Sequence, residues 1–211
     1  MAEQISLYKE SRFGDASNYC SIGTDGAITY VGTAKRHLSM RPFIEIGDIA
    51  VQEKPTVVTY GVTKGYSLPL YATNEEIFIS EYIVGRWDGA SNITLSIIGY
   101  LDTGVTDGKD FALQVSWVNK STSSGIIPAT STDVTVWTDC PSPRNAQYSI
   151  YKVDFAIDWD LNDPDIVASD FFSARIRRLP VGVGYSELDG GAEFVVTSIM
   201  IQYVIDKVFK A

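Results

Sequence analysis

The stretch Tyr151-Lys-Val-Asp-Phe-Ala-Ile-Asp-Trp159 decides the fold, because its large apolar residues occupy every second position. Side chains of a β-strand point alternately to opposite faces of the sheet. This period of two therefore predicts a strand with one buried and one exposed face. The residues expected on the buried face are Tyr151, Val153, Phe155, Ile157 and Trp159.

Seven further segments after residue 65 carry a strand pattern. In Phe111–Val118 the larger apolar residues share one face, and near the C-terminus Val195, Ile199, Ile201, Tyr203 and Ile205 do so, with Thr197 among them. The other segments are Ser67–Tyr71, Glu76–Ile83, Ile93–Leu101, Asp133–Thr138 and Phe171–Leu179. No stretch of ten residues has helical spacing. Eight antiparallel strands with uneven connections predict an all-β, eight-stranded jelly-roll sandwich. An immunoglobulin-like sandwich is the alternative, but no cysteine pair brackets a tryptophan at the expected spacing.

The first 65 residues differ from the rest in both pattern and charge. They contain only short extended pieces, Ile28–Val31, Pro42–Val51 and Thr56–Tyr60, separated by glycine and proline. We interpret residues 1–65 as an extended N-terminal arm with short strands, either a wrapping arm or a few edge strands, and residues 66–211 as the jelly-roll domain. The first part holds seven basic and seven acidic residues. The whole net charge of −9 therefore belongs to the second part.

This acidic balance argues against a nucleic-acid partner, which needs clustered Lys and Arg. A membrane partner is not expected either, because polar residues interrupt the most apolar run, residues 194–208. The N-terminus lacks the basic and apolar regions of a cleaved export signal, so synthesis in a reducing compartment is expected.

Cysteine and histidine are too scarce to support familiar catalytic or metal sites. Cys20 and Cys140 lie far apart without a C-x-x-C spacing, so they are either two free buried thiols or one disulfide. His37 is the one histidine and lies in the segment of low predicted structure. We expect no enzyme and no cofactor, although a glycosidase carboxylate pair would be invisible in sequence.

A series of segments resembles a known group of proteins. It comprises Leu68-Pro-Leu-Tyr71, Glu75-Glu-Ile-Phe-Ile-Ser-Glu-Tyr82, Gly85-Arg-Trp-Asp-Gly89, Ser96-Ile-Ile-Gly-Tyr100, Phe111-Ala-Leu-Gln-Val-Ser-Trp117 and Ala174-Arg-Ile-Arg-Arg178. Its order resembles jelly-roll virion structural proteins of bacterial and archaeal viruses, over roughly residues 56–206. The resemblance implies a virion component, such as a trimeric capsid decoration protein or part of a fibre, and brings no catalytic residues.

Three groups of residues are candidate sites. Arg175, Arg177 and Arg178 are interface candidates, because arginine is enriched at protein interfaces. Trp87, Trp137 and Tyr148 are candidates for stacking on a sugar. Trp87 lies in the Arg-Trp-Asp-Gly turn, where packing over a sheet end is the alternative. Asp158, Asp160 and Asn162 have the spacing of the first calcium ligands of an EF-hand, but the glycine and glutamate that such a loop needs are missing, so no metal site is predicted.

The leading hypothesis is a non-enzymatic, capsid-associated virion protein, made in the host cytoplasm. It would dock through its N-terminal arm on other virion proteins such as the major capsid protein, and associate with itself as a homotrimer. The alternative is a tail-fibre or receptor-binding domain that recognises a host glycan. A third hypothesis is a carbohydrate-active enzyme of jelly-roll type, which requires a close carboxylate pair in a groove.

Overall fold

The structure is a computed structural model. It describes residues 11–23, 28–31, 36–40, 43–46, 55–70, 76–83, 87–120, 131–158, 166 and 170–205. Within these ranges every regular element is a β-strand. A search of the same ranges accordingly finds no helix with the length and apolarity to cross a membrane.

The strands form three antiparallel sheets of three, five and six strands. The first contains β1 (Ser11–Gly14), β2 (Tyr19–Ile22) and β3 (Ile28–Val31). The five-stranded sheet has the order β11 (Thr132–Cys140), β10 (Lys109–Lys120), β13 (Phe171–Leu179), β8 (Ile77–Tyr82) and β5 (Phe43–Ile46). The six-stranded sheet has the order β12 (Ile150–Ile157), β9 (Ile93–Leu101), β14 (Phe194–Ile205), β7 (Thr63–Leu68) and β6 (Val57–Tyr60), and β4 (Arg36–Met40) also pairs with β14.

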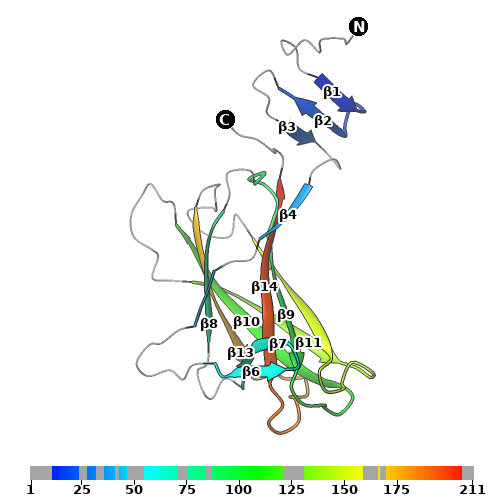
Figure 1. Cartoon of the computed structure of the whole chain (residues 1–211), viewed down its shortest axis with the longest axis vertical. Helices are drawn as coiled ribbons and strands as arrows, with labels where there is room; N and C mark the ends of the chain where they lie inside the picture. Colours follow the sequence, from blue (N-terminus) through cyan, green and yellow to red (C-terminus); the bar gives the residue numbers. More distant parts are fainter. Residues whose placement is uncertain are drawn as a thin grey trace.

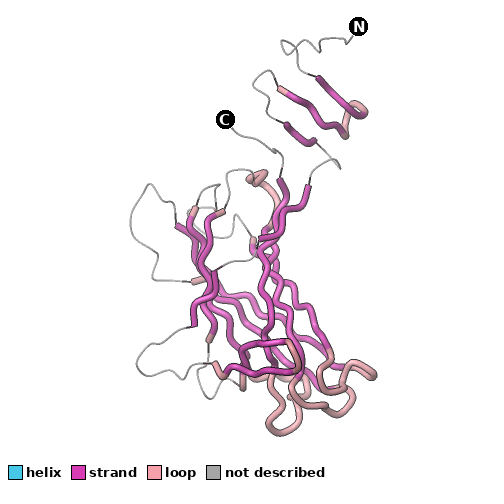
Figure 2. The backbone as a smooth tube through the Cα atoms, viewed as in Figure 1, coloured by secondary structure: helices cyan, strands magenta, loops and turns pink. Residues whose placement is uncertain are grey.

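The two larger sheets pack face to face and enclose one apolar core (Figures 1 and 2). Phe111 of the five-stranded sheet stacks on Phe194 of the other sheet, with ring centroids 4.8 Å apart, and meets Tyr151 edge-on at 5.4 Å. Each of these rings is fully buried. Removing such a side chain from water stabilises the fold by roughly 1.5–3 kcal/mol. The prediction of an all-β sandwich is therefore confirmed.

The strand pattern that decides the fold has the expected burial. From Ile150 to Ile157, exposed and buried residues alternate without exception, and Tyr151, Val153, Phe155 and Ile157 belong to the core. Trp159 lies outside the described residues. A strand lies at each of the eight segments expected after residue 65, from β7 to β14.

In β14 the prediction of a single apolar face from Val195 to Ile205 is wrong, because the strand contains a β-bulge. The register with β9 shifts between Val196 and Ser198, which leaves Thr197 as the extra residue. A one-residue insertion reverses which side chains point inward. Phe194 and Val196 consequently join the core, whereas Val195 belongs to the other face of the sheet.

Part of the segment interpreted as an arm belongs to the sandwich. Strand β4 pairs with β14, β5 pairs with β8, and β6 pairs with β7. The division expected between residues 65 and 66 falls inside β7. Strands β1 to β3 pair with one another, and Figure 1 draws this small sheet beyond the end of β14.

Candidate functional site

The outer face of the five-stranded sheet carries an ordered array of polar side chains on neighbouring strands. Leu113, Val115 and Trp117 of β10 are fully buried in the core, so Gln114 and Ser116 between them point to the outer face. Residues directly opposite each other in antiparallel strands share a face. Gln114 lies opposite Arg177, and Ser116 lies opposite Arg175. Two arginines and two polar side chains of β10 and β13 therefore meet on one surface.

Both arginines are fixed by hydrogen bonds along this surface. The Arg177 Nε donates to Gln114 Oε1 at 2.7 Å, and the Arg175 Nη2 donates to Ser116 Oγ at 3.1 Å. Their Nη1 atoms lie 3.8 Å and 3.5 Å from the same carboxylate oxygen, Oε1 of Glu76. Glu76 is only 5% exposed. One buried carboxylate thus holds two guanidinium groups in place.

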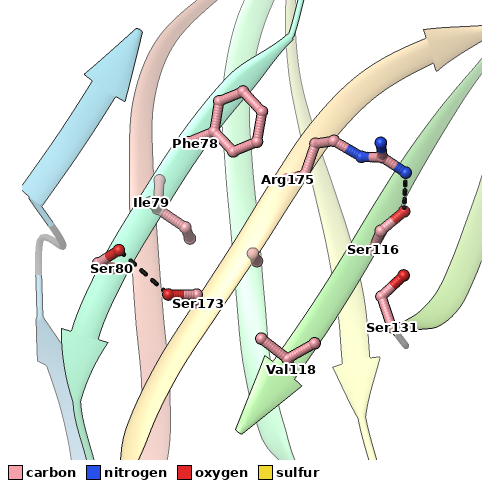
Figure 3. A pocket seen from close by; sticks show the side chains of 9 residues that line it. Phe78, Ile79, Ser80, Ser116, Val118, Ser131, Ser173 and Arg175 are labelled. Atoms are coloured by element: carbon pink, nitrogen blue, oxygen red, sulfur yellow. Dashed lines mark hydrogen bonds between the residues drawn. The ribbon is translucent and has the colours of Figure 1, made fainter. Parts of the chain in front are cut away.

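A hollow of about 360 Å³ opens next to Arg175 on the same face. Its walls come from β8, β10 and β13, together with Ser131, which precedes β11. Figure 3 shows Arg175 reaching from β13 over to Ser116 of β10, while Ser80 and Ser173 meet on the opposite side of the hollow. The Ser80 and Ser173 hydroxyl oxygens are 3.1 Å apart. Hydroxyls, a guanidinium group and an apolar floor therefore line one open cavity.

An exposed aromatic pair lies at the other end of this face. Trp137 of β11 is opposite Ala112 of β10, two residues before Gln114, so it shares the outer face. Its ring stacks on that of Tyr185, with centroids 5.6 Å apart and an interplanar angle of 10°. Trp137 is 45% exposed and Tyr185 is 47% exposed. The six residue-to-residue steps from Ala112 to Val118 span about 20 Å, which separates the aromatic pair from the far wall of the hollow.

Arg178 does not belong to this surface, so the row of three interface arginines is reduced to two. Alternation along β13 turns Arg178 inward, where it is 3% exposed. Its Nη2 lies 2.5 Å from Glu187 Oε1, and its Nη1 donates to the Ala192 carbonyl at 2.7 Å. Glu187 also accepts a hydrogen bond from the Val181 N–H at 3.0 Å. Arg178 therefore anchors the loop of residues 180–193 to the sandwich.

Further contacts hold this loop in place from the other side. Asp189 accepts the Thr106 N–H at 2.7 Å and lies 3.1 Å from Lys109 Nζ. Hydrogen bonds from the Thr106 hydroxyl and N–H lower the pKa of Asp189 to about 2. Asp110 accepts the Ser186 N–H at 2.9 Å. Because Ser186 follows Tyr185 in the chain, these contacts position the aromatic pair.

The three predicted stacking residues do not share a surface. Trp87 belongs to the core with 4% exposure, and its Nε1 donates to the Ser91 carbonyl at 3.0 Å. It therefore offers no open ring face to a sugar, and the packing alternative describes it. Tyr148 stacks on Tyr60, with centroids 3.5 Å apart, and meets Tyr100 edge-on. Of the three, Trp137 alone has its ring on the outer face of the five-stranded sheet.

The remaining candidates are the residues with calcium-ligand spacing and the two cysteines, and the structure describes only some of them. Asp158 is half-buried at the end of β12, whereas Asp160 and Asn162 lie outside the described residues. Among the residues that the structure does describe, no group of three His, Cys, Asp or Glu is placed to hold a metal ion. Both cysteines are free: Cys20 is half-buried, and burial raises the pKa of the Cys140 thiol.

Sequence reasoning missed Glu76, Gln114 and Tyr185. Glu76 begins a strand and carries no motif, and Gln114 occupies the polar side of an alternating strand. Tyr185 follows Gly182-Val-Gly184, and its neighbour Trp137 is nearly fifty residues away. The outward position of Gln114 follows from the alternation in β10, but its contact with Arg177 requires the strand order.

Comparison with known proteins assigns the chain to no family. No family model matches the chain, and no curated protein matches it. One similar solved structure is the crystal structure of a carbohydrate-binding module specific for non-crystalline cellulose, CBM28. It is 10% identical in sequence, with 80% of this chain and 87% of that chain covered, at a TM-score of 0.39. This likeness is too weak to support an argument about function.

Proposed function

We propose that this chain is a carbohydrate-recognition domain whose binding surface is the outer face of the five-stranded sheet. One observation carries the proposal: polar side chains held in place by hydrogen bonds lie between an exposed aromatic pair and an open hollow, all on one face. The aromatic pair is Trp137 with Tyr185, and the polar array contains Gln114, Arg175 and Arg177.

Each part of this surface suits the chemistry of a sugar chain. A sugar ring presents an apolar C–H face, which packs on an exposed aromatic ring such as that of Trp137. Its hydroxyls need donors and acceptors in fixed positions, which the guanidinium groups and the serine hydroxyls that line the hollow supply. Small-molecule sites combine apolar walls with a few well-placed polar groups. The length of about 20 Å along β10 provides room for several sugar units in a row.

We infer that the sandwich is a jelly roll with additional edge strands. Strands β7, β9, β12 and β14 lie in one sheet, and β8, β10, β11 and β13 lie in the other. The chain changes sheet at every connection between β7 and β14 except that from β10 to β11. Jelly rolls include both lectin and viral capsid domains, so this fold is compatible with either role and selects neither.

We further propose binding without hydrolysis. A glycosidase needs two carboxyl groups across the scissile bond, one of them able to donate a proton. Glu76 is buried beneath the two arginines of this face and lies against both guanidinium groups, so it does not face the surface where a sugar would bind. Incubation with the bound glycan, followed by chromatography, is expected to return the glycan intact. Released sugar would instead support the enzyme hypothesis.

The proposal is tested on a glycan array and then by calorimetry with the best ligand. Trp137→Ala is expected to weaken binding at least tenfold, because it removes the exposed ring from the surface. Tyr60→Ala is the matched control, since Tyr60 is 49% exposed and stacks on Tyr148 away from this surface. Absence of binding to any glycan at millimolar concentration would contradict the proposal. An equal loss in both variants would contradict the choice of surface.

We also propose a virion-associated role, which the small N-terminal sheet favours. Strands of four residues in a three-stranded sheet bury little apolar surface by themselves, so such a sheet benefits from a partner. Phe13 in β1 is 60% exposed. Docking on the major capsid protein or on further copies in a homotrimer would cover it.

Deletion of residues 1–31 tests this second role and leaves β4, β5 and β6 in the sandwich. The variant is expected to lose capsid association and to elute at a smaller size than the full chain. Unchanged capsid occupancy would contradict docking through this segment. Glycan binding is expected to survive the deletion, which separates the two proposals.

A further inference from the structure

The hollow beside Arg175 has a feature that a site for neutral sugars does not need. This feature is a guanidinium group with more N–H donors than its contacts with Ser116 and Glu76 use. A guanidinium carries five N–H donors. The contacts of Arg175 with described residues involve its two terminal nitrogens, toward Ser116 and Glu76. Its side chain is 32% exposed and lines the cavity. Arg175 can therefore donate to a ligand without losing the contacts that fix it.

The charge balance around Arg175 favours an anion. Glu76 lies against both Arg175 and Arg177, so one negative charge faces two positive ones. Glu76 is buried, which weakens the screening of its contacts by water and keeps it in place. Further acidic residues described on this face are Asp133 of β11, opposite Ser116, and the facing pair Asp110 and Asp139, which lies beyond Ala112 at the end that carries Trp137. No described ion pair joins Asp133 to either arginine, and its side chain is exposed to solvent.

The rest of the cavity fits the remainder of a sugar ring. The hydroxyls of Ser80 and Ser173 lie together on the wall opposite Arg175, and Phe78 and Val118 contribute apolar surface (Figure 3). Hydroxyls both donate and accept, as sugar hydroxyls require. A planar guanidinium matches the two oxygens of a carboxylate better than it matches separate hydroxyls. The volume of about 360 Å³ holds a single ring with room for solvent.

We infer that the hollow binds a carboxylate-bearing sugar unit, such as a uronate, with Arg175 as the group that contacts the carboxylate. This inference rests on the proposed function and specifies its ligand class. The net charge of the chain, −9, repels acidic glycans in general, so selection of an acidic sugar needs a local cationic group such as Arg175. Trp137 would hold a neighbouring unit of the same chain at the other end of the face.

The test compares two ligands that differ in the carboxylate, a glucuronate-containing oligosaccharide and a glucose oligosaccharide of equal length. Calorimetry of the full chain is expected to show at least tenfold tighter binding of the acidic ligand, with a preference that falls as salt rises. Arg175→Gln keeps a hydrogen-bonding group but removes the charge, and is expected to abolish the preference. Arg175→Lys keeps the charge without the planar fork, and is expected to retain part of it.

Lys152→Gln is the control, because Lys152 is an exposed cation on the six-stranded sheet. It is expected to leave the preference unchanged. Binding of the neutral ligand as tight as that of the acidic one, or an unchanged preference in Arg175→Gln, would overturn the inference and leave the proposed function standing. Binding of neither ligand, nor of any array glycan, would overturn both.

Discussion

Replacement of Arg178 by methionine removes the guanidinium that joins β13 to the loop of residues 180–193. Methionine retains most of the apolar volume, so the change isolates the lost contacts with Glu187 and the Ala192 carbonyl. Removing one partner of a buried ion pair costs about 3–5 kcal/mol. Glu187 keeps 29% exposure and regains some hydration, which places the expected loss near the lower end, about 3 kcal/mol.

The assay is equilibrium unfolding in urea, compared with that of Lys152→Met. The Lys152 Nζ lies 2.8 Å from Asp154 Oδ1, close to the distance between Arg178 and Glu187, but the Lys152 and Asp154 side chains are 46% and 48% exposed. Exposed pairs of this kind contribute about 0–1 kcal/mol. The difference between the two variants therefore reports burial rather than contact distance.

A double-mutant cycle completes the test. With Glu187→Gln as the second change, the coupling energy between Arg178 and Glu187 is expected to be about 1–3 kcal/mol. The reasoning would be refuted if Arg178→Met cost no more than Lys152→Met, or if the coupling were near zero. Either result would mean that other contacts hold the loop that carries Tyr185.

Three other perturbations test the packing and the loop end. Gly99→Ala is expected to lower the free energy of unfolding in urea by about 1–3 kcal/mol, because the new Cβ would lie 2.3 Å from the Val195 carbonyl oxygen. Gly182→Ala is the control and should change the free energy of unfolding little, because no atom lies within 4 Å of the Cβ that it adds. Asp189→Asn should make the melting temperature fall less steeply as the pH is lowered. The pKa of Asp189 in the folded protein is about 2, below the ordinary 3.8, so the stabilisation by its carboxylate is present above pH 3.8 and is lost as the pH falls toward 2. Phe155→Ala, at a fully buried position, should cost about 3–5 kcal/mol, and a loss below 1 kcal/mol would contradict the assigned core.

The strands could be predicted from sequence because each has a local signal. Alternation from Tyr151 to Ile157 needs one buried face and nothing else, and the structure follows it residue by residue. The bulge at Thr197 has no such signal. It lies where Gly65 and Gly99 approach β14 from both sides, a closeness that only the strand order creates.

The candidate site was predictable only in fragments. The alternation in β13 separates Arg178 from Arg175 and Arg177, so their different faces could be read from the sequence. The sequence could not predict which of the candidate tryptophans is exposed, because Trp87 is held by a β-bridge to Ile205, more than a hundred residues further along the chain. The contact between Trp137 and Tyr185 depends likewise on the loop that Arg178 anchors.

The most direct test of the binding surface is an NMR titration of the full chain with the glycan selected on the array. If the outer face of the five-stranded sheet binds the glycan, the largest shifts fall on the amides of β10 and β13, around Gln114, Ser116 and Arg175, and on the Trp137 indole. Amides on the outer face of the six-stranded sheet, around Ser96 and Asp154, should hardly move. The largest shifts on that second face, with β10 and β13 unchanged, would contradict the account.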